Sequence, residues 1–72
     1  MEFKKKFATD IYHARNRQKI TQQAVSDVLS ISLREYQNIE YGKVLPRLDT
    51  FFKLVDLFQL NLEVYRELLS AE

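Results

Sequence analysis

With 72 residues, the chain is about half as long as a typical domain and predicts one compact domain over residues 1–72. Hydrophobic residues at 46%, charged residues at 29% and a net charge of +1 exclude a disordered chain, and one glycine and one proline favour an all-helical fold. The lack of cysteine excludes disulfides and thiolate sites, and a single histidine leaves a zinc site short of ligands, so we expect no metal and no other cofactor.

The first predicted helix covers residues 2–18, because apolar residues recur there with the period of an amphipathic helix. They are Phe3, Phe7, Ile11 and Ala14. A second, two-turn helix is predicted over residues 22–29, and Thr21 ahead of it is a suitable N-cap. The chain therefore begins with a long helix followed by a short one.

A third helix is predicted over residues 33–40. Ser32 and Glu35 have the S-x-x-E spacing of a capping box, in which each side chain accepts a hydrogen bond from the backbone N–H of the other residue. Gly42 is the only glycine of the chain, and we expect it to close this helix in the left-handed conformation.

Two more helices complete the predicted fold. The apolar residues of helix 48–58 wrap more than half of its circumference, which indicates a central helix. The last helix, over residues 62–70, follows Asn61 as its cap. The sequence thus predicts the all-α class and a compact five-helix bundle.

Helices 22–29 and 33–40 are short and closely joined, which is typical of a helix-turn-helix pair. Tyr36 and Ile39 share one face of the second helix and are expected to anchor it to the core. The opposite arc carries Leu33, Arg34, Gln37 and Asn38. Arginine can bind guanine, glutamine or asparagine can bind adenine, and leucine can touch a thymine methyl group. Such side chains are also common on any exposed helix, so both interpretations stay open at this point.

Further motifs accompany this helix pair. They are Arg15 in the first helix, Ile20-Thr21-Gln22, the run from Tyr36 to Lys43, and Pro46 ahead of Leu48-Asp49-Thr50-Phe51. Through these residues, the stretch 11–69 resembles the phage repressor/Cro (Xre) family of helix-turn-helix proteins. The resemblance implies a lambda repressor-like fold whose helix-turn-helix consists of the second and third helices. Two common glycine positions of the family are Ser30 and Gln59 here.

The resemblance also implies a role for individual residues. Base contacts would come from Leu33, Arg34, Gln37 and Asn38. Phosphate contacts would come from Thr21, Gln22, Ser32, Tyr41, Lys43 and Arg47. Arg15 and Glu40 match the ion pair with which the family links its first helix to the end of its third.

Together these features predict a transcriptional regulator, acting as a repressor, that binds double-stranded DNA sequence-specifically with helix 33–40 in the major groove. We expect a homodimer, because the family usually binds inverted half-sites and one small module offers few contacts. Its dimer face is expected at Tyr65, Leu68 and Leu69. Residues 1–19 carry a net charge of +4 and residues 48–72 carry −3, which predicts a positive end and a negative end.

The alternative function is a protein-interaction module with the same fold, such as an antitoxin or a regulator subunit with little DNA specificity. The modest net charge and the apolar Leu33 among the base-facing residues favour it. The run Lys4-Lys5-Lys6 is either a basic arm that reaches DNA or a solvated helix start.

An enzyme is not expected, because the sequence supplies no catalytic set. Asp10 and His13 could form an acid–base pair, part of a metal site or an exposed helical ion pair. No apolar run is long enough to span a bilayer, and the first ten residues do not read as a secretion signal. We therefore expect a cytoplasmic protein without a membrane partner.

Overall fold

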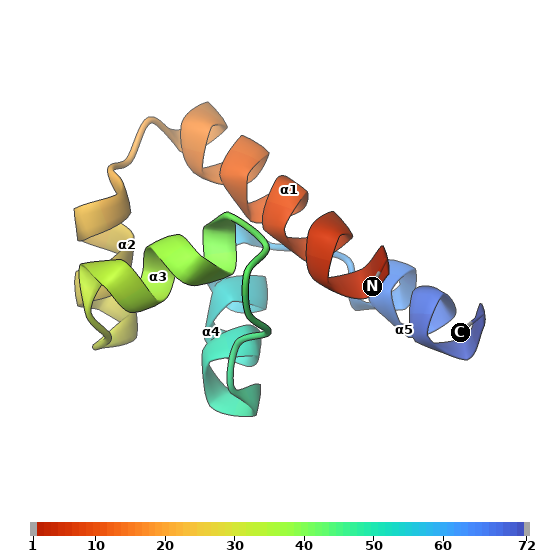
Figure 1. Ribbon diagram of the computed structural model, residues 1–72. Coiled ribbons are helices and arrows are strands. Elements are labelled where there is room, and N and C mark those ends of the chain that lie inside the picture. Colours follow the sequence, from red (N-terminus) through yellow and green to blue (C-terminus); the bar gives the residue numbers. More distant parts are fainter. Residues whose placement is uncertain (1, 72) are drawn as a thin grey trace.

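The computed structural model describes the backbone of residues 2–71 and the side chains of residues 3–68, and this part of the chain contains helices but no strand. The helices are α1 (Glu2–Gln18), α2 (Gln22–Leu29), α3 (Leu33–Glu40), α4 (Leu48–Phe58) and α5 (Leu62–Ala71) (Figure 1). They begin and end where the sequence predicts, except that α5 extends one residue further. The predicted all-α class and the five-helix architecture are confirmed.

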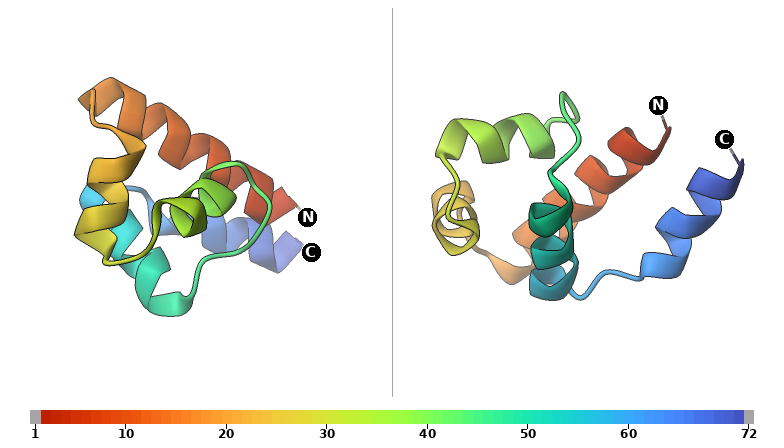
Figure 2. Two further views of the ribbon diagram at one scale, coloured as in Figure 1. Left: turned by 60° about the vertical axis from the view of Figure 1, so that its left-hand side comes forward. Right: turned by 90° about the horizontal axis from the view of Figure 1, so that it is seen from below.

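The core is formed where α1 crosses the other helices. α2 packs against α3 and α4, and α1 contacts α3, α4 and α5 (Figure 2). The fully buried side chains with the largest volume include Tyr36, Phe7, Ile11, Leu29 and Leu54. Because α5 packs on α1, the acidic last helix lies beside the basic first one. The predicted separation into a positive and a negative end is therefore wrong.

The first four helices all end with a residue in the left-handed conformation. These residues are Lys19 (φ 56°), Ser30 (φ 59°), Gly42 (φ 74°) and Gln59 (φ 53°). At Ser30, the backbone N–H donates to the Asp27 carbonyl (3.2 Å), and the next N–H, of Ile31, donates to the Ser26 carbonyl (3.1 Å). This pair of bonds is the Schellman motif, and it recurs at the other three ends. The expected role of Gly42 is confirmed, whereas the other three positions carry a side chain.

Side-chain caps fix where α2 and α3 begin. The Thr21 hydroxyl oxygen accepts from the Ala24 N–H at 3.0 Å. The predicted capping box is present, because Ser32 Oγ accepts from the Glu35 N–H (3.0 Å) and Glu35 Oε1 accepts from the Ser32 N–H (3.4 Å). Together with the closure at Ser30, these caps define the turn between the two helices.

The prediction that α4 is a central helix is wrong, because one of its faces is exposed. Leu54, Val55 and Phe58 are buried, but Leu48 is 73% exposed and Phe52 is also exposed. The physical reason is the small size of the bundle: α5 makes its main contacts with α1, so the remaining face of α4 is left uncovered.

A buried ion pair joins α1 to the last turn of α3. Arg15 Nη2 lies 2.9 Å from Glu40 Oε1, and Arg15 Nε lies 3.1 Å from Oε2. The guanidinium also donates to the Ile20 carbonyl at 2.9 Å, which ties the loop before α2 to the same group. The side chain of Glu40 is 0% exposed and that of Arg15 is 13% exposed. Hydrogen bonds to Glu40 raise the pKa of Arg15 although burial opposes this, so the guanidinium stays charged.

Relief of backbone strain predicts a stabilised variant. Ser30→Gly is expected to raise the free energy of unfolding by about 0.5–1 kcal/mol. Glycine adopts the left-handed conformation without a Cβ clash, and this gain is partly offset because glycine makes the unfolded chain more flexible. Urea unfolding followed by circular dichroism measures the change. Ser30→Ala keeps the Cβ and is the control, for which no gain is expected. A glycine variant no more stable than the alanine variant would contradict this account.

Loss of one partner of the buried ion pair is expected to be costly. Glu40→Gln keeps the shape of the side chain but leaves the Arg15 charge without its counter-ion, so the free energy of unfolding should fall by about 3 kcal/mol. The double substitution Arg15→Met with Glu40→Leu removes both charges and should recover most of this loss. Equal urea midpoints for Glu40→Gln and the unsubstituted protein would show that the pair does not stabilise the fold.

Candidate nucleic-acid interface

α3 presents one polar face away from the core. Its buried side holds Tyr36, Ile39 and Glu40. Its other side holds Arg34, which is exposed, and Leu33, Gln37 and Asn38, which are half-buried. In Figure 2 (right), α3 lies along one edge of the molecule. The structure thus brings the four residues expected to contact bases together on an accessible helix surface.

A chain of side-chain hydrogen bonds connects the start of α2 to α3. The Gln37 amide donates to Gln22 Oε1 at 3.2 Å, and the Gln22 amide donates to the Tyr41 hydroxyl oxygen at 3.2 Å. Gln22, expected to contact a phosphate, therefore lies beside Tyr41, which has the same expected role. Sequence reasoning did not predict these bonds, because they join residues 15 and 19 positions apart that only the packing of the two helices brings together.

The two capping hydroxyls keep a proton to donate. The oxygens of Thr21 and Ser32 accept from backbone N–H groups inside their own helices. A hydroxyl that accepts one such bond can still donate its own hydrogen. Both residues can therefore cap a helix and donate to an anion.

Two exposed cations follow the end of α3. Lys43 lies one residue after Gly42, and its carbonyl accepts from the ammonium group of Lys4 at 3.5 Å. Arg47 lies before α4 and is 3.7 Å from the Asp49 carboxylate, with both side chains largely exposed. An exposed pair of this kind is weak and leaves the guanidinium accessible to another anion.

One residue of the expected dimer face, Tyr65, is buried in the core. Tyr65 is 3% exposed, because its ring packs against Phe3, Phe7 and Phe51 and its hydroxyl donates to Asp10. Burial, the hydrogen bond to Asp10 and the Asp10 charge all raise the pKa of this hydroxyl. Leu68 is half-buried, and Leu69 lies outside the side chains that the structure describes.

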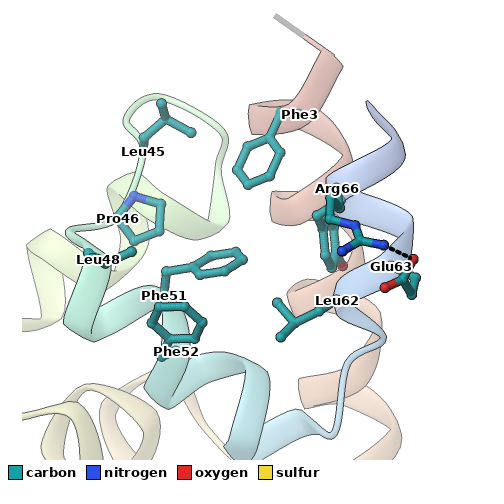
Figure 3. A pocket seen from close by; sticks show the side chains of 10 residues that line it. Phe3, Leu45, Pro46, Leu48, Phe51, Phe52, Leu62, Glu63 and Arg66 are labelled. Atoms are coloured by element: carbon teal, nitrogen blue, oxygen red, sulfur yellow. Dashed lines mark hydrogen bonds and ion pairs between the residues drawn. The ribbon is translucent and has the colours of Figure 1, made fainter. Parts of the chain in front are cut away.

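An apolar groove of about 550 Å³ lies beside Tyr65, between α4, α5 and the loop before α4 (Figure 3). Its walls include Leu45, Leu48, Phe51, Phe52, Leu62 and Arg66. Glu63 and Arg66 pair across one turn of α5 at its margin (3.0 Å). The groove exists because α4 is uncovered on this side.

The side chains considered for catalysis do not form a pair. Asp10 accepts from Lys6 (3.0 Å) and from the Tyr65 hydroxyl, whereas the His13 ring stands edge-on to Tyr12 at 5.3 Å between centroids. Among the alternatives for Asp10 and His13, the helical ion pair is not formed, and Asp10 pairs with Lys6 instead. Within the described residues, no group of three potential metal ligands occurs. The helices described here all lack the combination of length and apolar character needed to cross a membrane.

Comparison with known proteins identifies the family. A family model described as helix-turn-helix matches residues 11–65, which is more than half of the chain. No curated protein and no solved structure matches the chain. The matched stretch contains α2 and α3 entirely, together with the Arg15–Glu40 pair. The chain therefore belongs to the helix-turn-helix family of the phage repressor/Cro (Xre) type, whose domains bind DNA in transcription regulation.

Proposed function

We propose that the protein is a sequence-specific regulator that binds double-stranded DNA with α3 in the major groove. The single observation that carries this proposal is the outward face of α3, which holds Arg34, Gln37 and Asn38 on the side opposite its buried residues. This face is held by the caps of α3 and by the Arg15–Glu40 pair.

Each base-facing residue has a distinct chemical role in the proposed complex. Arg34 is the most exposed of the four and suits a bidentate bond to guanine O6 and N7. Asn38 and Gln37 suit adenine, because the Gln37 amide nitrogen that donates to Gln22 keeps its second hydrogen and the carbonyl oxygen for a base. Leu33 adds an apolar surface for a thymine methyl group.

Phosphate contacts set the register of α3 in the groove. In this proposal the backbone passes the N-terminus of α2, where Thr21 and Gln22 offer donors and the helix dipole favours an anion. Tyr41, joined to Gln22 by a hydrogen bond, lies beside the same phosphate position, and Ser32, Lys43 and Arg47 are further phosphate contacts in this proposal. Such contacts supply affinity and orientation rather than sequence information.

The proposed regulatory effect is repression by occupancy. A small domain that fills the major groove of an operator blocks access of other proteins to it without further machinery. A cytoplasmic location is part of the same proposal.

A homodimer is proposed as the active form, because one module of this size buries too little DNA surface for high affinity. We place its interface at the apolar groove, with Phe52 and Leu62 at the centre. The margin carries both Glu63 and Arg66, so two copies related by a two-fold axis can present opposite charges to each other.

The second candidate function is a protein-interaction module, and the same groove is the observation that favours it. A heterologous helix with apolar residues on one face would fill it as well as a second copy would. In this case the occupant would be a different protein, such as another regulator subunit or the toxin partner of an antitoxin.

Selection from a random duplex DNA library tests the proposed function. The protein should enrich one motif, arranged as an inverted repeat. Arg34→Ala should weaken binding to that site by about 1–3 kcal/mol and relax preference at one base position. Lys43→Ala should weaken binding to all sequences evenly and lower the salt dependence. Enrichment of no motif would favour the protein-interaction function, whereas unchanged binding of an enriched motif by both variants would show that α3 does not dock on DNA as proposed.

Sedimentation velocity tests the dimer interface. Leu62→Glu introduces a charge into the apolar groove and should convert the dimer to a monomer, with weaker binding to the inverted repeat. Val28→Glu places the same charge on an exposed position of α2 and is the matched control, for which the dimer should persist. Identical sedimentation of both variants and the unsubstituted protein would remove the groove as the interface.

A further inference from the structure

The three lysines at the start of α1 differ in what they contact. The Lys4 ammonium donates to the Lys43 carbonyl at 3.5 Å, and the Lys6 ammonium pairs with Asp10 at 3.0 Å. Lys5 is exposed, and among the described residues nothing forms a hydrogen bond or an ion pair with its ammonium group. The ammonium groups of Lys4 and Lys6 thus have partners within the protein, and that of Lys5 is available to a ligand.

Lys5 lines a polar cleft of about 400 Å³ between α1 and the end of α3. α1 contributes Lys5, Thr9 and Tyr12 to its wall, and the end of α3 contributes Tyr41. The residues that line the cleft thus include one that carries an ammonium group and three that carry a hydroxyl group. These are donors to an anion.

Glu40, the acidic residue that lines the cleft, does not repel a bound anion. Glu40 is held by three hydrogen bonds from Arg15, whose charge balances its own. Among the residues that line the cleft, Lys5 therefore carries the one uncompensated charge. A single positive charge matches the single negative charge of a phosphodiester better than the double charge of a free phosphate monoester.

The cleft continues the surface proposed to follow the DNA backbone. Tyr41 belongs to the cleft and also hydrogen-bonds to Gln22 at the start of α2. The N-terminal end of α1 lies toward the same edge of the molecule as α3 (Figure 2, right). Tyr12 and Tyr41 are 47% and 57% exposed, so both residues are accessible from solvent.

We propose that this cleft binds a backbone phosphate of the DNA beyond the bases that α3 reads, with Lys5, Thr9 and Tyr12 as donors beside Tyr41. The inference rests on the proposed function and extends it to α1. The added contact increases affinity and the length of DNA covered, and it carries no base preference.

The test uses the selected duplex and two charge-matched variants. Lys5→Gln removes the charge of the cleft, and Lys53→Gln removes an exposed charge from α4 as the control. Lys5→Gln should lower the magnitude of the slope of log K against log salt by about 0.9 for each bound subunit, and therefore by about 1.8 for a homodimer on the inverted repeat, whereas the control keeps the slope. Ethylation interference should show one phosphate outside the half-site that is required by the unsubstituted protein and by Lys53→Gln but not by Lys5→Gln. The preferred base sequence should be the same for all three proteins.

Three outcomes would overturn the inference in different ways. If Lys5→Gln matches Lys53→Gln in slope and in ethylation pattern, α1 makes no phosphate contact, while DNA binding by α3 stands. If inorganic phosphate alone saturates the backbone amide shifts of Thr9 and Gly42 at millimolar concentration and the ethylation pattern stays unchanged, the cleft is a site for a free anion. If the unsubstituted protein binds no duplex at any salt concentration, the proposed function fails and the inference with it.

Discussion

The buried contact between Arg15 and Glu40 is the interaction on which the rest of the structure depends. It joins the middle of α1 to the last turn of α3, and through the Ile20 carbonyl it also holds the loop that leads into α2. Two charges removed from water are tolerated only when they meet in good geometry, so the pair admits few other orientations of α3. The buried ion pair therefore fixes the orientation of α3 relative to α1. The direction in which the polar residues on the outer face of α3 point follows from that orientation.

The elements could be predicted from the sequence because their causes are local. The period of Phe3, Phe7 and Ile11 defines α1, and the capping box at Ser32 and Glu35 defines the start of α3 whatever the rest of the chain does. The polar arc of α3 could be predicted for the same reason, since positions on one helix determine which residues share a face. The helix-turn-helix pair follows from these local signals together with the family resemblance.

The errors concern which surfaces meet, and that is decided by the whole bundle. An apolar face predicts burial but does not identify its partner, so Leu48 was expected inside and lies outside, and Tyr65 was expected outside and lies inside. Both follow from one packing choice, the position of α5 against α1. The hydrogen bonds of Gln22 to Tyr41 and Gln37 could not be predicted from the sequence for the same reason. Gln22 comes within reach of these two side chains only when α2 and α3 have packed together.

The way α5 is attached has a consequence for local stability. This helix is held mainly to α1, through the ring of Tyr65 and its bond to Asp10, whereas α2 and α3 share buried residues with each other and with α1 and α4. Local opening of α5 thus exposes far less apolar surface than separation of α2 from α3, and it costs less free energy. The backbone amides of α5 will then exchange their hydrogens through a partial opening, while those of α2 and α3 exchange only when the whole domain unfolds. The packing therefore predicts two cooperative units, one formed by α1 to α4 and the other by α5.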